Sequence, residues 1–191
     1  MKKVAIISTV ALACATSSFA GDWFVGAEVG HSEIKGKISS QYASLSGDIE
    51  GGHQAIKIGK YINDNVRVAG SVYRFNEDDD VDVSLMTVGA DYLFGQDKLK
   101  PFVGIHLGNL SYKESGLPST FNKSSIEIDS TIYGLGFGLN YQINNNVELE
   151  CGYKLSKTDG KDSVTYIPTS TVVNIESDDA TSWYFGVNYR F

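Results

Sequence analysis

Apolar and polar side chains alternate along most of this chain. The last nine residues show the pattern most clearly, with apolar side chains at every second position: Trp183, Phe185, Val187, Tyr189 and Phe191. Successive side chains of a β-strand point to opposite faces, so this stretch predicts a strand with one apolar and one polar or small face. Seven earlier segments repeat the pattern, at 23–32, 54–62, 66–75, 83–94, 102–112, 133–141 and 147–155.

Short and long connections alternate between these segments. The short ones are rich in Asn, Asp and Gly and lie at 63–65, 95–101 and 144–146. The longer ones lie at 33–53, 76–82, 113–126 and 156–180. This rhythm predicts an antiparallel up-and-down meander with turns at one end and loops at the other. Each segment has roughly the nine to eleven residues that a tilted strand needs to cross a bilayer.

The chemistry of the two faces favours a membrane barrel. One face is dominated by glycine with a few charges, and the other carries aromatic residues near the strand ends. Aromatic girdles around an apolar band are typical of outer-membrane barrels. Lipid cannot hydrogen-bond to a sheet edge, so we expect the sheet to close, with the C-terminal strand against the strand that starts at Trp23. The alternative is a soluble, lipocalin-like barrel with its apolar face inside.

The first 20 residues predict a cleaved secretory signal. Lys2 and Lys3 precede a short apolar stretch, and Ser18-Phe19-Ala20 fits a cleavage site between Ala20 and Gly21. Residues 21–191 then form a single barrel domain. A retained N-terminal anchor and a lipoprotein modified at Cys14 are the alternatives.

Charge and cysteine content limit the chemistry. The net charge is −7 without clusters of Lys or Arg, which argues against a nucleic-acid partner. Only Cys151 remains after the signal, so the sequence predicts no disulfide framework and no thiolate metal site. Residues 21–191 contain no predominantly apolar run of 18 residues and therefore no predicted transmembrane helix. We expect no cofactor and no metal.

The C-terminal strand, Pro101-Phe102-Val103-Gly104 and Gly134-x-Gly136-x-Gly138 carry a family resemblance. The chain resembles the small eight-stranded outer-membrane β-barrels of Gram-negative bacteria, the OmpA/OmpX-like or opacity-type "porin family" proteins. The resemblance implies an all-β, closed, eight-stranded transmembrane barrel in the outer membrane, with both termini in the periplasm. It also makes Trp183, Phe185, Val187, Tyr189 and Phe191 an assembly signal. Unlike OmpA itself, the chain is not expected to carry a peptidoglycan-binding domain.

The resemblance also implies partners and a role. Outer-membrane lipid, lipopolysaccharide and the assembly machinery are the expected partners, with a possible host or surface ligand at the loops. The expected function is structural or surface-interacting, in adhesion or defence, through loops around 33–53, 113–126 and 156–180. We expect no enzyme. The alternatives are a lipid-modifying enzyme of the outer membrane and a soluble periplasmic ligand-binding barrel.

Several charged residues share the polar face of their strands. An eight-stranded barrel is just wide enough for side chains to fill, so a "porin" resemblance does not imply a pore. We expect the lumen charges to pair across the barrel, with Arg67 and Lys57 facing the acids, because an unpaired charge in a confined interior is costly. The predicted network consists of Glu28, Lys57, Arg67, Glu148, Glu150 and Lys154. The alternative is that these side chains sit in lumen water and contribute little to stability.

Other candidate sites are weaker. Neighbouring residues of His31-Ser32-Glu33 point to opposite faces, so they cannot form a catalytic relay among themselves. The sequence suggests no His/Ser pair on adjacent strands, and His106 reads as a structural lumen histidine. The acidic segment 77–82 could attract Ca²⁺, but it lacks the glycine of an EF-hand loop and reads as a solvated loop.

Overall fold

The computed structural model describes residues 22–40, 44–75, 81–95, 97–115, 120, 122, 125–169 and 171–191. The predicted signal peptide, its Ala20–Gly21 cleavage site and residues 77–80 of the acidic segment lie outside the described residues. Among the described residues, no helix is long and apolar enough to cross a bilayer.

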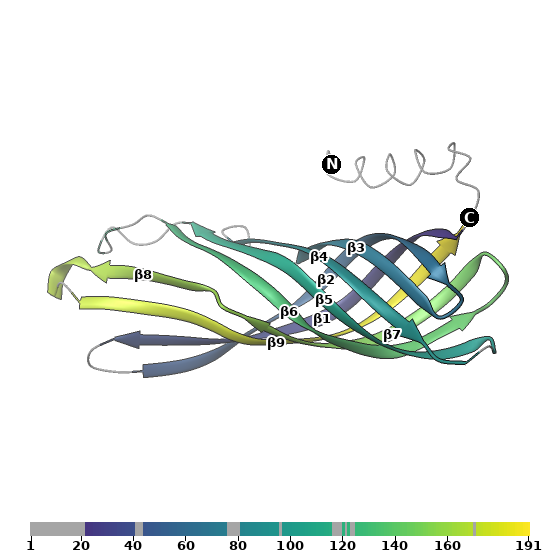
Figure 1. Cartoon of the computed structure of the whole chain (residues 1–191). Helices are drawn as coiled ribbons and strands as arrows, with labels where there is room; N and C mark the ends of the chain where they lie inside the picture. The colour runs from purple at the N-terminus through teal and green to yellow at the C-terminus, as the bar shows by residue number, and fades with distance from the viewer. Residues whose placement is uncertain are drawn as a thin grey trace, which may run out of the picture.

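The described chain folds into one antiparallel sheet that closes on itself (Figure 1). Its strands are β1 (Trp23–Ser40), β2 (Ser44–Asn63), β3 (Val66–Phe75), β4 (Val81–Leu93), β5 (Leu99–Ser115), β6 (Ser125–Gln142), β7 (Val147–Thr158), β8 (Lys161–Tyr166) and β9 (Thr171–Arg190), with a short 3-10 turn η1 (Ile167–Thr169) before β9. Each strand from β1 to β7 pairs with the next, β7 pairs with β9, and β9 pairs back with β1. Eight strands therefore form the barrel, which confirms the predicted fold class.

The closing seam joins the two segments that the sequence predicted to meet. Val25 lies opposite Tyr189 and His31 lies opposite Trp183, in one register as far as Ile34. A bulge in β9 then shifts the register by one residue. Beyond the bulge, β9 continues along β1 and also pairs with β8, which widens the sheet there.

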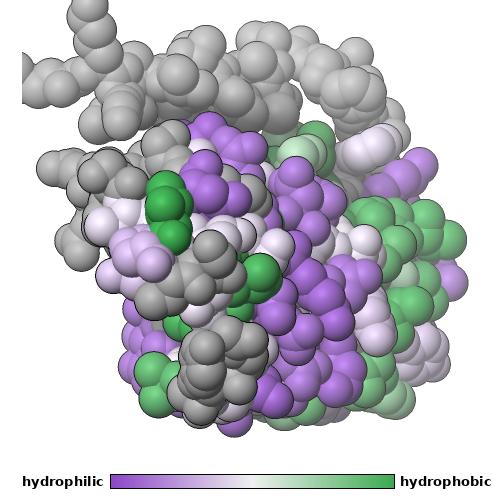
Figure 2. All heavy atoms as spheres, turned by 90° about the vertical axis from the view of Figure 1, so that its left-hand side faces the viewer, coloured by the Kyte–Doolittle hydropathy of each residue, from purple (hydrophilic) through white to green (hydrophobic). Residues whose placement is uncertain are grey.

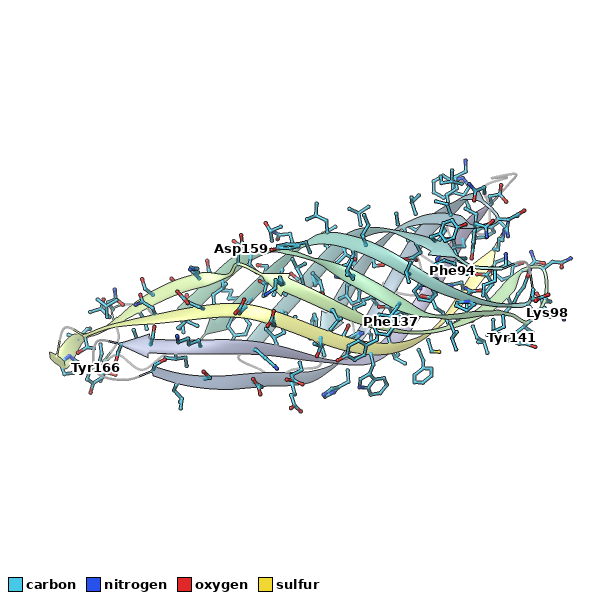
Figure 3. The ribbon with its side chains drawn as sticks, turned by 60° about the horizontal axis from the view of Figure 1, so that its bottom comes forward. Phe94, Lys98, Phe137, Tyr141, Asp159 and Tyr166 are labelled. Atoms are coloured by element: carbon cyan, nitrogen blue, oxygen red, sulfur yellow. The ribbon has the colours of Figure 1, made fainter. Side chains whose placement is uncertain are left out.

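The two ends of the barrel differ. The short turns after β2, β4 and β6, the start of β1 and the end of β9 gather at one end, which we call the turn end (Figure 1). The hairpins β1–β2 and β8–β9 project at the other end, which we call the hairpin end (Figure 1). Tyr166 lies near the tip of the β8–β9 hairpin (Figure 3).

The strands are longer than the sequence predicted. Most of 33–53 and 156–180 and part of 113–126 were expected to be loops, and they form the upper parts of β1, β2, β5, β6, β8 and β9 instead. That prediction was wrong, because charged residues in these segments do not mark irregular structure. In the fold they occupy the outward positions of regular hairpins.

The side-chain alternation inverts along single strands. In the half of β6 nearer the turn end, Leu135 and Phe137 are exposed and alternate with glycines that face the lumen. Figure 3 labels Phe137 on this part of the wall. In the half of β6 nearer the hairpin end, which we call the upper part of the barrel, Ile126 and Ile128 are buried inside, while Glu127 and Asp129 are exposed outside. An apolar exterior suits lipid and a polar exterior suits water. The inversion therefore marks the upper edge of the apolar belt.

An apolar and aromatic cluster fills part of the lumen and reaches the turn end. Its members are at most 4 % exposed and come from β1, β2, β4, β5 and β9: Phe24, Tyr61, Leu93, Phe102 and Tyr184. The guanidinium of Arg67 lies over the rings of Phe24 and Phe102, with its carbon 5.8 Å and 5.1 Å from the two centroids. This cluster and the charged residues above it fill most of the barrel and leave a cavity of about 60 Å³ between them.

Candidate functional site

Six charged residues that share the polar faces of their strands point into the middle of the barrel. Glu28 comes from β1, Lys57 from β2 and Arg67 from β3, while Glu148, Glu150 and Lys154 follow one another on β7. All are buried except Lys154, which is partly exposed. Strand alternation alone selects these positions, because each residue lies an even number of places from an inward neighbour on its own strand.

Glu150 is the centre of this network. Its carboxylate lies 2.9 Å from Lys57 Nζ and 2.7 Å from Arg67 Nη1, the latter an ion pair whose angle falls outside that of a hydrogen bond. The Tyr184 hydroxyl and the Asn188 amide also donate to it, at 2.7 Å and 3.0 Å. Two cations and two neutral donors thus offset the burial of one carboxylate.

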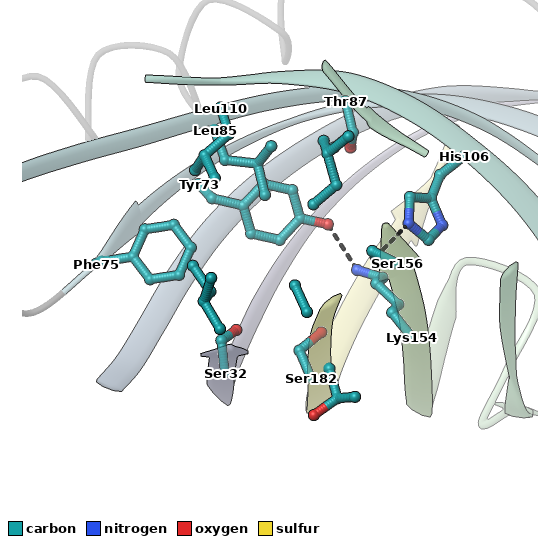
Figure 4. Close-up of a pocket in the computed structure, with 14 residues that line it drawn as sticks. Ser32, Tyr73, Phe75, Leu85, Thr87, His106, Leu110, Lys154, Ser156 and Ser182 are labelled. Carbon is teal, nitrogen blue, oxygen red and sulfur yellow. Dashed lines mark hydrogen bonds between the residues drawn. The ribbon is translucent and has the colours of Figure 1, made fainter. Parts of the chain in front are cut away.

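Glu28 forms a second centre towards the hairpin end. Lys154 Nζ lies 2.9 Å from one carboxylate oxygen, and Lys57 Nζ lies 3.7 Å from the other. Lys154 also donates to the Tyr73 hydroxyl at 2.6 Å (Figure 4) and lies 4.1 Å from the centroid of the Tyr184 ring. Lys57 therefore links the two acids into one continuous network.

Glu148 differs from the expectation. It was expected to face Arg67 or Lys57, but its carboxylate accepts from the Tyr61 hydroxyl at 2.7 Å and the Asn140 amide at 3.1 Å. The acid that joins Glu150 at Arg67 is Asp91, whose Oδ2 lies 2.9 Å from Arg67 Nε. Neutral donors rather than cations therefore satisfy Glu148.

Sequence reasoning missed the neutral members of the network. They are Tyr61, Tyr73, Asn140, Tyr184 and Asn188, all buried. Their place on the polar face was visible in the sequence. Tyrosine and asparagine alternate with apolar residues without carrying a charge, so nothing in the pattern marked them as partners of the acids.

The network compensates its charges and is suited to a structural role. Every charged member contacts an opposite charge or, for Glu148, two neutral donors. The described residues contain no cluster of three or more His, Cys, Asp or Glu side chains that could hold a metal ion. The structure therefore supports a rigid, closed cross-section at this level.

Two serine–histidine contacts lie above the network. His106 Nε2 on β5 lies 2.8 Å from Ser156 Oγ on β7 (Figure 4), and Ser32 Oγ on β1 lies 2.9 Å from His53 Nδ1 on β2. The Ser32–His53 contact joins adjacent strands, so the expectation that adjacent strands hold no His/Ser pair was wrong, whereas His106–Ser156 joins strands separated by β6. The sequence pattern does not reveal these contacts, because each depends on the register of the strands that carry it.

The segment His31-Ser32-Glu33 does not act as a unit. His31 lies outside the barrel, with its ring centroid 6.3 Å from that of Trp183 and Nε2 3.7 Å from a Glu50 oxygen. Ser32 lines the lumen and contacts His53. The two side chains therefore lie on opposite sides of the wall.

The residues of the expected assembly signal face outward. Trp183, Phe185, Val187, Tyr189 and Phe191 are between 38 % and 59 % exposed and form part of the apolar belt. The Trp183 and Tyr189 rings each pack edge-on against the aromatic ring two residues further along β9. This strand contacts both β1 and β7, so it completes the barrel.

Comparison with known proteins agrees with this architecture. The family described as "Outer membrane protein beta-barrel domain" matches residues 4–191. No curated protein matches the chain in sequence.

Among solved structures, Neisserial surface protein A is 23% identical with a TM-score of 0.58, over 88% of this chain and 97% of that chain. OprG from Pseudomonas aeruginosa is 14% identical with a TM-score of 0.62, over 90% and 96%. Outer membrane protein W from E. coli is 16% identical with a TM-score of 0.50, over 92% and 100%. At these identities the similarity establishes the fold alone.

Proposed function

We propose a role for this chain from the premise that it belongs to the outer membrane protein β-barrel family. It is an integral protein of the bacterial outer membrane. In our proposal the turn end and both termini face the periplasm, and the hairpin end stands outside the cell. The barrel anchors the hairpins, and they perform a structural or surface-interacting role in adhesion or defence, with a host or surface molecule as ligand.

The inverted alternation is the observation that supports this proposal. Above the apolar belt, the strands continue as regular hairpins whose outward faces carry charges such as Asp129, Lys161 and Glu176. Figure 2 views this end, where hydrophilic residues cover much of the described surface. A polar surface on a rigid scaffold suits recognition in water, whereas the belt below suits contact with lipid and lipopolysaccharide.

Cysteine labelling tests the orientation. In a Cys151→Ser background, Asp129→Cys places a thiol at the hairpin end and Asn145→Cys places one at the turn end, both at exposed positions. A maleimide too large to enter the periplasm should label Asp129→Cys in intact cells and Asn145→Cys only after permeabilisation. The reverse result would overturn the orientation.

Shortening one hairpin tests the interaction. Gly36 lies opposite Gly47, and Lys35 lies opposite Asp48. Deleting residues 37–46 therefore leaves a two-residue Gly-Gly turn, which suits a tight hairpin. We expect attachment of cells to animal cells or survival in serum to fall, while the amount of heat-modifiable barrel in the outer membrane stays the same. Unchanged attachment and survival would refute an interaction through this hairpin.

The His106–Ser156 contact favours a second candidate, a lipid-modifying enzyme. A serine hydrogen-bonded to a histidine can act as a nucleophile in acyl transfer. Both residues line a cavity of about 50 Å³, together with Ser182 (Figure 4). Among the described residues, no carboxylate forms an ion pair with His106 that would orient its ring. The enzymatic function is therefore less well supported than the surface role.

A serine-directed fluorophosphonate distinguishes the two candidates. An enzyme would be labelled in a lipid nanodisc, and Ser156→Ala would abolish labelling while Ser182→Ala, in the same cavity, would not. We expect no labelling of the unaltered protein, as the surface role requires.

A further inference from the structure

A second, larger cavity lies inside the hairpin end, above the charged network. Its volume is about 370 Å³. Inward-facing apolar side chains from six strands line it, among them Ile34, Phe75, Val83, Leu110, Ile128 and Ile175. All of its lining residues belong to the described part of the chain. We call this cavity the upper chamber.

The lining of the upper chamber is apolar, whereas a water-filled barrel end would be lined by polar side chains. A lumen that holds only water is polar in membrane barrels. Here Ile128 and Val83 are buried, while the outward neighbours Asp129 and Ser84 are exposed. The walls thus have the pattern of a soluble core, but space remains between them. A concave apolar cavity of this volume lies within the usual range for small-molecule sites.

The chamber ends in a closed floor. Two smaller cavities lie below it: one of about 50 Å³, which shares Ser32, Ile34, Phe75 and Leu110 with the chamber, and one of about 60 Å³ within the charged network. Tyr73 and Lys154 line both of these cavities and are hydrogen-bonded to each other (Figure 4). The charged network surrounds the lower cavity and leaves only about 60 Å³ of space there, too little for a molecule that fills the chamber. A molecule that enters the chamber is therefore held there rather than passed through the barrel.

The charges around the chamber disfavour ions. Glu50 and Glu176 belong to its lining, and each has one basic partner outside the barrel wall, His31 and Lys161 respectively. In the floor, Lys154 already contacts Glu28 and Tyr73. The two carboxylates are thus directed away from the interior, and an anion in the chamber would meet no free cation among the described lining residues. A cation would lose its hydration against mostly apolar walls.

Ser177 supplies one polar position in this apolar site. Its hydroxyl oxygen is buried and has no hydrogen-bond partner among the described residues. By contrast, the hydroxyl of Ser130, which also lines the chamber, accepts from Thr158 Oγ1 at 2.8 Å. A buried hydroxyl normally has a partner, so Ser177 marks where a ligand oxygen would bind.

We propose that the upper chamber binds a small, uncharged, mainly apolar molecule that carries one hydroxyl or carbonyl group, which hydrogen-bonds to Ser177. The chamber is too small for a peptide helix or a folded partner. The site is independent of the surface role proposed above, because it lies inside the wall that carries the outward charges.

The isoleucines of the chain allow a direct test by methyl NMR in lipid nanodiscs. Ile34, Ile126, Ile128 and Ile175 line the chamber, while Ile58 and Ile105 face outward in the apolar belt. With 1-octanol as probe, we expect saturable shifts at the chamber methyls. Shifts confined to Ile58 and Ile105 would show partition into lipid only and would overturn the proposal, as would the absence of any shift. Octanoate should bind the chamber with an affinity at least tenfold lower than that of 1-octanol, measured from the same methyl shifts. Equal affinities would overturn the preference for a neutral ligand.

Matched variants locate the site. Ile128→Trp should fill the chamber and weaken octanol binding at least tenfold, whereas Leu135→Trp, which faces outward on the same strand, should leave it unchanged. Leu110→Phe serves the same purpose if Ile128→Trp fails to give a heat-modifiable barrel. Ser177→Ala should weaken octanol binding about two- to tenfold, the range for one lost hydrogen bond, and leave octane binding unaltered. Equal octanol binding in Ser177→Ala would remove Ser177 from the site, and equal binding in both filled variants would refute the chamber.

Discussion

Arg67 Nη1 and Glu150 Oε2 lie 2.7 Å apart in a part of the lumen where the two side chains are 2% and 1% exposed. Arg67 comes from β3 and Glu150 from β7, on different sides of the barrel. Their contact therefore ties opposite walls together. Arg67 also contacts Asp91 on β4, and Glu150 also contacts Lys57 on β2, so the ion pairs connect four strands.

Arg67→Ala should lower the thermal unfolding temperature of the detergent-folded barrel. The substitution leaves Glu150 buried beside Lys57 as its remaining cation, and removing one partner of a buried ion pair costs about 3–5 kcal/mol. The boiling-dependent shift in gel mobility, followed against temperature, measures the effect.

Lys161→Ala is the matched control for Arg67→Ala. Lys161 also forms an ion pair, with Glu176 at 3.4 Å, but both side chains are exposed. Such a pair contributes about 0–1 kcal/mol, so the unfolding temperature should barely change. If Arg67→Ala behaves like Lys161→Ala, the lumen charges are hydrated and contribute little.

Gly152→Ala should also destabilise the barrel, by crowding the network. An added Cβ at Gly152 would lie 2.6 Å from the Tyr184 ring and hydroxyl, and this hydroxyl donates to Glu150. Such overpacking in a filled interior costs about 1–3 kcal/mol. The same change at Gly70, where the nearest atom is 3.8 Å away, should leave the unfolding temperature unaltered. Equal stability of the two variants would mean that Tyr184 moves aside freely.

The inverted alternation on β6 predicts how far the apolar belt extends. Phe137→Arg places a cation outward within the belt, where it should cost about 2–4 kcal/mol against lipid. Thr131→Arg places the same side chain outward on the same strand, beyond Tyr133, and should cost little. Urea titration of the barrel folded into lipid vesicles measures both. Equal free energies of unfolding would show that the belt does not end between these positions.

Much of the barrel could be predicted from the sequence because its lower half follows a simple rule. Glycines and charges inside, and aliphatic and aromatic residues outside, gave the eight strands, the short turns and the β1–β9 seam. The same parity placed Glu28, Lys57, Arg67 and Glu150 on inward positions, where the structure brings them together.

The upper half and the contact partners could not be predicted in this way. There the rule reverses, so Ile126 and Ile128 belong inside and the charges beside them belong outside. A reading that treats outward charge as a sign of a loop ends the strands too early. Contacts such as His106–Ser156 depend on the relative stagger of strands that are not neighbours, and a single sequence does not contain that information.

The outward aromatic residues of β9 predict a difference between assembly in cells and refolding in detergent. Phe191 N donates to Trp23 O at 2.9 Å through the backbone, while its side chain lies outside, 5.4 Å from the Tyr189 ring between centroids. Phe191→Ala keeps the backbone contact and removes only the exposed ring. Purified protein should therefore refold in detergent as before, because the ring packs against no lumen residue.

In cells, the same variant should assemble into the outer membrane several-fold less, if the assembly machinery reads the aromatic face of this strand. Phe137→Ala is the control, since it removes an equally outward aromatic ring from β6. Heat-modifiable protein in the outer-membrane fraction measures assembly. A similar loss in both variants would mean that lipid contact, rather than recognition of β9, drives the effect, and no loss in Phe191→Ala would remove Phe191 from the signal.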